Sequence, residues 1–478
     1  MQTGLEEQLG LYQKRIPIVT RSVKGRFRRF KTAVLVLAYA IFFLLPWLPW
    51  HRLDAPSQAV LFDLPARHFL IFGLTVYPQD VVWLALLLFI AAILLFFVTG
   101  LVGRAFCGYF CFQTVWTDFF IWIEARLQGE RPARIRLIRQ PWDREKILKV
   151  GGTHVLWVLA SFWTALSFVL YFGYAPDLLV RFFQGEAAAA AYLTVSILTV
   201  LTYAAAGLMR EQVCTYVCPY GRFQSAMYEP PTLAVHYDVR RGEGAHGRAS
   251  ARAGLRTLGA RHAQGHGDCV DCNLCVQVCP AGIDIRDGLQ YKCISCGLCI
   301  DACNTIMDSF NFPRGLIRYD SEANLALAAP DKPRLHWKRL NIIGYGIALV
   351  LMTGYLGYSI VTRSSFDRAV TQIRQPLYVV LSNGDIRNRY QIRLTNKSGR
   401  DMRYQIDATG LPVGALDLGN FRQLSIKTGH SALVQASVRL SPEWAARTST
   451  FNLSITPLDL PGERRIEAIR FDKPGGQK

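Results

Sequence analysis

The sequence has 478 residues, of which 51% are hydrophobic, and it carries a formal net charge of +19. So large an apolar fraction disfavours an ordinary soluble enzyme and favours a membrane protein with several spanning helices. The twelve cysteines all fall in regular clusters, which disfavours a secreted disulfide framework and indicates metal or redox chemistry.

Five apolar segments are long enough to cross a hydrocarbon core about 30 Å thick. They lie near residues 30–50, 81–103, 154–174, 187–209 and 340–361. The first segment follows a basic leader and has no small-residue cleavage site. We therefore expect it to be an uncleaved anchor rather than a signal peptide.

Lysine and arginine gather in alternate loops. They are dense before the first span, after the second and after the fourth, whereas loops 51–80 and 175–186 are sparsely charged. The positive-inside rule therefore predicts three cytoplasmic segments, 1–29, 104–153 and 210–339. Residues 362–478 are then expected in the periplasm of a Gram-negative host. This asymmetry accounts for most of the positive charge, so we expect contact with membrane lipid and no nucleic-acid partner.

Two cysteine pairs with C-x3-C spacing follow the even-numbered spans. Cys107 and Cys111 occur in RAFCGYFCF, and Cys214 and Cys218 occur in CTYVCPYG. Both spans are expected to run inward, which would place both pairs at the cytoplasmic membrane face. Residues i and i+4 share one side of a helix, so each pair can present two sulfurs to a common point. Four soft ligands at one depth suit Cu(I), an iron–sulfur cluster or a dithiol/disulfide couple, and the spacing does not choose among them.

Residues 240–268 separate the fourth span from the remaining cysteines. They are rich in Gly, Ala and Arg and contain His246, His262 and His266. We interpret this segment as a flexible basic linker near lipid headgroups rather than as a histidine metal site.

Eight cysteines form two copies of C-x2-C-x2-C-x3-C, in CVDCNLCVQVCP (269–280) and CISCGLCIDACN (293–304). Two-residue gaps let the chain curl so that three thiolates face one [4Fe–4S] cube, while the other copy supplies the fourth ligand. One cluster is expected on Cys269, Cys272, Cys275 and Cys303. The other is expected on Cys293, Cys296, Cys299 and Cys279. A zinc site does not explain triplets repeated twice, so we predict two [4Fe–4S] clusters that carry single electrons.

Residues 363–478 contain short alternating runs, such as RYQIRLTN, ALVQASVRL and TFNLSITPL, separated by turn sequences. About seven such strands predict an antiparallel β-sandwich of the immunoglobulin kind. The predicted fold class is thus a multi-domain membrane protein: an α-helical transmembrane bundle of about five spans, an inserted ferredoxin-like α+β domain and a C-terminal all-β immunoglobulin-like sandwich. The expected parts are a cytoplasmic segment (1–29), a transmembrane region (30–239), a linker with the ferredoxin-type domain (240–339), the fifth span (340–361) and a periplasmic domain (362–478).

With these motifs in place, the chain resembles the FixG/RdxA/CcoG family of membrane polyferredoxins, accessory proteins of cbb3-type cytochrome c oxidase. The resemblance rests on CGYFCFQTVWTDFF, CTYVCPYGRFQSAM, GDCVDCNLCVQVCPAGIDIRDGLQ, CISCGLCIDAC and GLIRYDSE. It implies [4Fe–4S] binding by the eight cysteines, a redox role for the four paired cysteines, and service to copper delivery through reduction of Cu(II) to Cu(I). Family members usually carry proline after the second cysteine of each pair. This chain has Phe112 after the first pair and Pro219 after the second, which leaves the backbone turn at 111–113 uncertain.

The motifs predict an iron–sulfur electron-transfer protein of the inner membrane, and the resemblance implies an oxidoreductase of the cupric-reductase kind with copper at the paired cysteines. Its expected partners are oxidase subunits or copper chaperones and an unidentified electron donor. One alternative is a non-enzymatic oxidase assembly factor. Another is a quinol dehydrogenase resembling the NapH-type membrane ferredoxins, for which His154, Tyr203 and Asp118 are candidate polar residues. No nucleotide-binding fingerprint is present, so the donor is expected to be another protein or a quinol.

Overall fold

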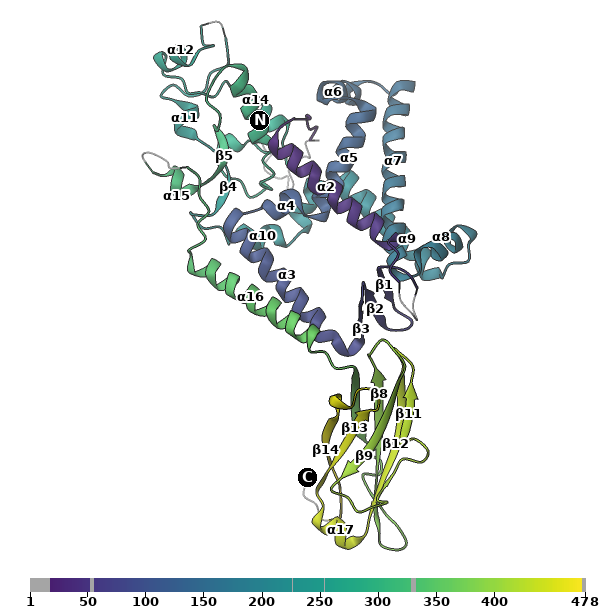
Figure 1. Ribbon diagram of the computed structural model, residues 1–478. Helices are drawn as coiled ribbons and strands as arrows, with labels where there is room; N and C mark the ends of the chain where they lie inside the picture. The colour runs from purple at the N-terminus through teal and green to yellow at the C-terminus, as the bar shows by residue number, and fades with distance from the viewer. Residues whose placement is uncertain (1–17, 52–55, 226, 253, 328–331, 475–478) are drawn as a thin grey trace, which may run out of the picture. The chain divides into compact units, whose positions relative to one another are not determined.

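A computed structural model describes residues 18–51, 56–225, 227–252, 254–327 and 332–474 (Figure 1). Their contacts divide the chain into two compact units, one reaching to Gly354 and the other beginning at Tyr355. The first unit contains four long apolar helices, most of a fifth, and the cysteine-rich region. The second contains two β-sheets.

Five helices are long and apolar enough to cross a membrane, which confirms the expected bundle of about five spans. They are α2 (Arg26–Leu44) with η1 (Leu45–Trp47), α3 (Val81–Val102), α7 (Arg144–Val169) with η3 (Leu170–Phe172), α9 (Ala189–Thr202) with the π-helical η4 (Tyr203–Met209), and α16 (Leu340–Val361). Many of their apolar side chains are exposed: Leu87, Leu88 and Phe89 of α3 are 54%, 60% and 63% exposed. Such a surface suits contact with lipid.

The third span begins earlier than hydropathy predicts. Helix α7 starts at Arg144 rather than near residue 154, because the Asp143 side chain accepts a hydrogen bond from the Lys146 backbone N–H and caps the helix. Hydropathy locates the apolar part of a helix, whereas the cap sets its first residue.

Shorter elements connect the spans. The loop after the first span contains an antiparallel sheet and a short helix: β1 (Val60–Asp63), β2 (His68–Ile71), β3 (Leu74–Val76) and η2 (Pro78–Asp80). The segments after the second and third spans form α4 (Ala105–Tyr109), α5 (Phe112–Gln128), α6 (Arg131–Arg139) and α8 (Ala175–Gln184). The fourth span is followed by the π-helical η5 (Val213–Val217) and by α10 (Tyr220–Ser225).

Two strands from the ends of the cysteine-rich region hold it together. Strand β4 (Leu233–Tyr237) pairs antiparallel with β5 (Ile317–Ser321), so this folded region begins before residue 240. Its helices are α11 (Val239–Glu243), α12 (Leu258–Ala263), α13 (Leu274–Gln277), η6 (Ile285–Asp287), α14 (Leu298–Ser309) and α15 (Glu322–Leu325). Buried Val235, Ile300 and Ile317 form an apolar core around the cysteines.

The segment expected to be a flexible linker, residues 240–268, instead makes defined backbone hydrogen bonds where the structure describes it, at 240–252 and 254–268. The Arg261 side chain is fully buried and donates hydrogen bonds to the Gly267 and Cys269 carbonyls at 2.8 and 2.7 Å. A buried guanidinium needs several acceptors, and this loop supplies them from its own backbone. The composition suggested flexibility because it does not reveal that one arginine organises the loop.

The second unit is an antiparallel β-sandwich, as the alternating runs predict. One sheet has the order β10 (Leu416–Asp417), β12 (Ser431–Leu440), β8 (Ile386–Asn396), β6 (Phe366–Gln372), with β7 (Val379–Val380) also paired to β8. The other has the order β11 (Gln423–Ile426), β9 (Met402–Thr409), β13 (Thr450–Pro457), β14 (Arg465–Arg470). Two short helices, α17 (Pro442–Arg447) and η7 (Pro461–Glu463), complete the unit. Its core joins both sheets, with Leu394 of β8 and Tyr404 of β9 each 0% exposed.

Candidate metal centre

The eight cysteines of the two runs surround two cavities. One cavity is lined by Cys269, Cys272, Cys275 and Cys303. The other is lined by Cys279, Cys293, Cys296 and Cys299. Each cavity thus takes three cysteines from one run and the fourth from the other run. Cys275 lines the second cavity as well, so the two cavities are neighbours.

The backbone curls in the same way in both runs. Asp271 and Ser295 occupy matched positions and have φ angles of 48° and 50°. Asn273 and Gly297, also matched, have φ angles of 55° and 70°. Left-handed residues on either side of the second cysteine turn the chain, which brings three sulfurs to one side.

Burial makes these thiols hard to ionise unless a cation is bound. Burial, and then the three other cysteines of its cavity, raise the pKa of Cys303 to about 12. Burial and then Cys296 raise the pKa of Cys279 to about 12. Iron binds the thiolate form, so the positive charge of the metal must offset the cost of ionising these groups.

The donor set fits an iron–sulfur cluster better than a single metal ion. Among the described residues, no three His, Cys, Asp or Glu side chains converge closely enough to hold one ion. A mononuclear zinc site needs its sulfurs about 2.3 Å from one metal, whereas a cluster spreads its ligands over the corners of a cube. Four sulfurs around each cavity meet that need, and a [4Fe–4S] cluster supplies one-electron transfer when bound.

The four paired cysteines come together as a further sulfur centre, the thiol quartet, which consists of Cys107, Cys111, Cys214 and Cys218. Burial and then the other three thiols of the quartet raise the pKa of Cys107 to about 12, against an opposing effect of Arg104. Burial and then Cys111 raise the pKa of Cys214 to about 11. Cys107 therefore lies within electrostatic range of the other three thiols, and Cys214 lies within that range of Cys111 and Cys218.

Neither pair lies on one continuous helix, contrary to the expected i, i+4 arrangement. Cys107 is in α4, whereas Cys111 is an extended residue that precedes α5. Cys214 is in η5, and the extended Cys218 ends it. The ψ angles of Cys111 and Cys218 are 130° and 113°, so the two turns are alike although Phe112 replaces the usual proline. A helix break, rather than a helix face, brings the sulfurs together.

The thiol quartet contacts the second cysteine run directly. The Tyr109 hydroxyl donates a buried hydrogen bond to the Cys296 carbonyl at 2.8 Å. A Cβ on Gly108 would lie 2.6 Å from the Ile294 carbonyl oxygen and 3.0 Å from the Cys296 Cα, so glycine is required for this close approach. Cys107 also packs on the apolar group that contains Cys296.

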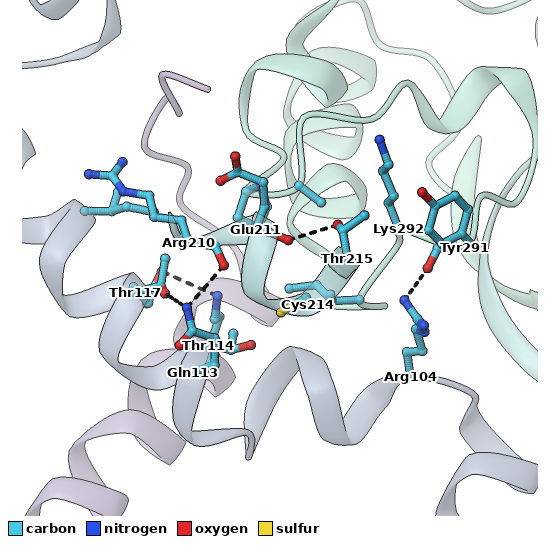
Figure 2. Close-up of a pocket in the computed structure, with 16 residues that line it drawn as sticks. Arg104, Gln113, Thr114, Thr117, Arg210, Glu211, Cys214, Thr215, Tyr291 and Lys292 are labelled. Atoms are coloured by element: carbon cyan, nitrogen blue, oxygen red, sulfur yellow. Dashed lines mark hydrogen bonds and ion pairs between the residues drawn. The ribbon is translucent and has the colours of Figure 1, made fainter. Parts of the chain in front are cut away.

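Arg104 links the quartet to the same run, and it is 5% exposed. Its guanidinium donates a hydrogen bond to the Tyr291 carbonyl, close to Cys293 in sequence (Figure 2). A cavity opens beside Cys214 in this view. Its charged lining consists of Lys31, Arg104, Arg210, Lys292, Asp118 and Glu211. Positive side chains outnumber negative ones there.

The N-terminus of the first spanning helix, α2, contacts the second cysteine run. Asp301 of α14 accepts hydrogen bonds from the Phe27 and Arg28 backbone N–H groups at 3.3 and 2.7 Å. The residue before α2, Gly25, has no side chain to cap the helix, so a carboxylate from another part of the chain does so. The sequence alone does not point to Asp301, because capping residues are sought next to the helix they serve.

The three polar residues considered for a quinone site make structural contacts. The Asp118 carboxylate pairs with Arg28 at 2.9 Å and with Lys31 at 3.4 Å. His154 Nδ1 and the Tyr203 hydroxyl lie 2.9 Å apart. Asp118 lines the cavity beside Cys214, whereas the lining of that cavity does not include the other two.

Three family models match the chain. Residues 209–322 match a 4Fe-4S dicluster domain, residues 84–129 match a 4Fe-4S binding domain, and residues 356–474 match the Ig-like fold at the C-terminus of FixG. The dicluster match covers all eight cysteines of the two runs. The chain therefore binds iron–sulfur clusters.

Curated relatives match over most of their length. Protein RdxA and protein RdxB of Cereibacter sphaeroides are 42% and 43% identical, over 84% and 85% of both chains. Nitrogen fixation protein FixG of Rhizobium meliloti is 40% identical, over 85% of this chain and 82% of that protein. A solved structure of a FixG-related protein from Vibrio parahaemolyticus matches 23% of this chain and 98% of that one, with 17% identity and a TM-score of 0.20. From the near full-length identities, the chain belongs to the FixG/RdxA family of iron–sulfur electron-transfer proteins.

Proposed function

We propose that the protein transfers electrons through its iron–sulfur clusters and the thiol quartet to Cu(II), producing Cu(I) for the assembly of a cytochrome c oxidase. The contact between the quartet and the second cysteine run supports this proposal most strongly. Gly108 and Tyr109 of the quartet segment touch the backbone of Cys296, a predicted cluster ligand. Biological electron transfer is short-ranged, so this contact gives the clusters an outlet.

The two cysteine runs suit different ends of the proposed electron path, the first run the entry of electrons and the second run their transfer to the quartet. Cys272 of the first run is exposed, whereas Cys293 and Cys296 of the second are buried. A soluble donor can therefore approach the first run, while the second run faces the quartet. Copper fits as the acceptor because soft sulfur ligands favour Cu(I), the form in which copper is handed on.

We further propose that the protein lies in the inner membrane with both sulfur centres on the cytoplasmic side and the β-sandwich in the periplasm. The support is the excess of Lys and Arg in alternate loops. Reporter fusions at positions 270 and 400 should report opposite compartments. The same compartment at both positions would contradict five spans.

Copper reduction is testable on the purified, full-length protein. Anaerobic protein is reduced with dithionite, freed of excess reductant and mixed with Cu(II), and Cu(I) is measured with a Cu(I)-specific chelator. The wild type should yield Cu(I). Replacement of the four quartet cysteines by serine should abolish this while the signals of the eight-cysteine clusters remain. An unchanged rate in the serine variant would contradict the quartet's role.

The same measurement distinguishes the proposed copper reductase from the alternative of a non-enzymatic assembly factor. A non-enzymatic factor would bind oxidase subunits or copper chaperones without reducing Cu(II), and serine at the quartet would leave that binding unchanged. For a quinol dehydrogenase, the structure offers no matching support among the described residues, since Asp118 is held by two cations and His154 bonds to Tyr203.

A further inference from the structure

We propose that Arg286 makes the cluster of the first cavity easier to reduce than the cluster of the second, so that the first electron taken up resides on the solvent-facing side. The first cavity is lined by Cys269, Cys272, Cys275 and Cys303, and the second by Cys279, Cys293, Cys296 and Cys299. This order of reduction holds whichever acceptor lies beyond the two clusters, so it does not depend on the proposed copper chemistry.

The linings of the two cavities differ in polarity. Three polar side chains line the first cavity, those of Tyr237, Asn273 and Arg286. The second cavity, apart from its cysteines, is lined by Val235, Ile283, Ile285, Ile294, Leu298 and Gly297. Among the described residues, no Asp, Glu, Lys or other Arg lines either cavity. A cluster gains one negative charge on reduction, and nearby charge, hydrogen bonds to sulfur and solvent exposure set its potential. The positive lining therefore favours reduction in the first cavity.

Hydrogen bonds hold the Arg286 guanidinium in place, and its side chain is 7% exposed. Its Nε and one terminal nitrogen donate to the Asp284 carboxylate at 2.8 and 2.6 Å. The other terminal nitrogen donates to the Asp271 carboxylate at 2.6 Å, and the Asn273 side chain accepts a further hydrogen bond. A guanidinium fixed by so many acceptors keeps its positive charge at the wall of the first cavity.

The two carboxylates bound to Arg286 do not cancel its effect on the cysteines. Neither Asp271 nor Asp284 lines the cavity, and their side chains are 43% and 23% exposed, so water screens their charges more than that of Arg286. Burial raises the pKa of Cys275 to about 12, and the opposing effect of Arg286 on this thiol exceeds the raising effect of Asp284. Thiolates and a reduced cluster are both negative, so the same cation stabilises both.

The second cavity has a weaker source of positive charge, Arg104. Burial raises the pKa of Cys293 to about 11, and Arg104 opposes this less than the backbone N–H of Ser295 does. The guanidinium of Arg104 lines the cavity beside Cys214 and not the second cluster cavity. An apolar lining opposes the addition of a further negative charge.

Solvent exposure acts in the same direction as Arg286. Cys272 is exposed, whereas Cys293 and Cys296 are buried, so water stabilises added charge at the first cavity more than at the second. Cys275 lines both cavities, which places the two clusters next to each other. The solvent-facing side therefore collects the first electron and holds it until an acceptor beyond the second run draws it onward.

An anaerobic potentiometric titration of the full-length protein, followed by low-temperature EPR, tests this order. The signal lost or altered in Cys272→Ser belongs to the first cavity, and the one lost or altered in Cys296→Ser belongs to the second, whichever run supplies each fourth ligand. In the wild type, the first cluster should be reduced at the higher potential. Equal potentials, or reduction of the second cluster first, would overturn the proposal.

Two substitutions of opposite charge effect test the part played by Arg286. Arg286→Gln should lower the potential of the first cluster and leave that of the second unchanged. Asp284→Asn removes a negative charge from the same group and should raise the potential of the first cluster. A purely structural role would not produce shifts of opposite sign. Arg286→Lys keeps the charge and should give a potential between those of the wild type and Arg286→Gln.

Arg314→Gln is the matched control. The Arg314 side chain is 69% exposed, pairs with Asp308 and lines neither cavity, so both potentials should stay at their wild-type values. Should Arg286→Gln fail to assemble the first cluster, Asp284→Asn and Arg286→Lys decide the matter. An unchanged potential in Asp284→Asn, or a shift of the second cluster in place of the first, would overturn the role of Arg286.

Discussion

The two cysteine runs have the same spacing and the same left-handed backbone positions, yet their surroundings differ. In the first run Cys272 is exposed, and Arg286 bonds to the Asp271 and Asn273 side chains between the cysteines. In the second run Cys296, which matches Cys272, is 7% exposed, and Ser295, which matches Asp271, is 1% exposed. Sequence spacing thus sets the ligand geometry in both runs, while the rest of the fold turns one toward solvent and the other toward the membrane helices.

The membrane-facing character of the second run comes from three contacts. Gly108 lies against its backbone, Tyr109 bonds to Cys296, and Asp301 caps the first spanning helix. The first run makes different contacts: the position matched to Asp301 is Gln277, whose carbonyl accepts a hydrogen bond from the Arg21 N–H, and Val278 packs in the apolar group that Cys107 joins. The two copies of the motif thus contact the membrane segments through different residues.

The largest expected effect is loss of a cluster. Cys279→Ser should destroy the cluster of Cys293, Cys296 and Cys299, because the first run supplies its fourth ligand. Cys303→Ser should destroy the other cluster. EPR of the two reduced variants should lose complementary signals. Loss of the Cys269, Cys272 and Cys275 cluster in Cys279→Ser would show that each run keeps its own four ligands.

The next effect is a difference in the rate of cluster loss. With Cys272 exposed, the first cluster should be dismantled before the second when the protein is treated with ferricyanide and an iron chelator. The signals assigned by the two serine variants identify which cluster decays first. Equal decay, or earlier loss of the second cluster, would contradict the solvent-facing role of the first run.

A change at Gly108 should disturb the second run, whose backbone this glycine approaches. Gly108→Val would drive side-chain atoms into the Ile294 carbonyl and the Cys296 backbone, at a cost of about 1–3 kcal/mol in the free energy of unfolding. The EPR spectrum of the second cluster should change, while that of the first stays the same. Gly151→Ala is the control, because a Cβ there meets nothing within 4 Å.

The smallest effect concerns the cap on α2. Asp301→Ala removes the acceptor for the Phe27 and Arg28 N–H groups and should cost about 1 kcal/mol in the free energy of unfolding, measured by thermal denaturation in detergent. Asp308→Ala on the same helix, where the side chain pairs with exposed Arg314, should leave the melting temperature unchanged. Equal decreases in melting temperature in the two variants would show that the hydrogen bonds from Asp301 to α2 do not stabilise the protein, and that any substitution in α14 has the same effect.

Much of the fold could be predicted because its signals are local. The apolar length of the five spans and the alternation of the β-sandwich depend on stretches of about 5–22 residues, each of which must bury or expose its own side chains. The spacing of Cys269 to Cys275 likewise predicts three inward-facing sulfurs. The early start of α7 at Arg144 was missed because a polar cap overrides hydropathy.

The sequence by itself determined the membrane class, the sandwich and the two matched cysteine runs, because periodicity and short-range spacing encode them. Only the tertiary structure decided that Tyr109 meets Cys296, that Arg104 meets Tyr291, and that Asp301 caps α2. These features join residues far apart in the chain. Each satisfies a buried hydroxyl, cation or helix end whose partner can come from any segment, and local sequence carries no record of which segment the fold brings near.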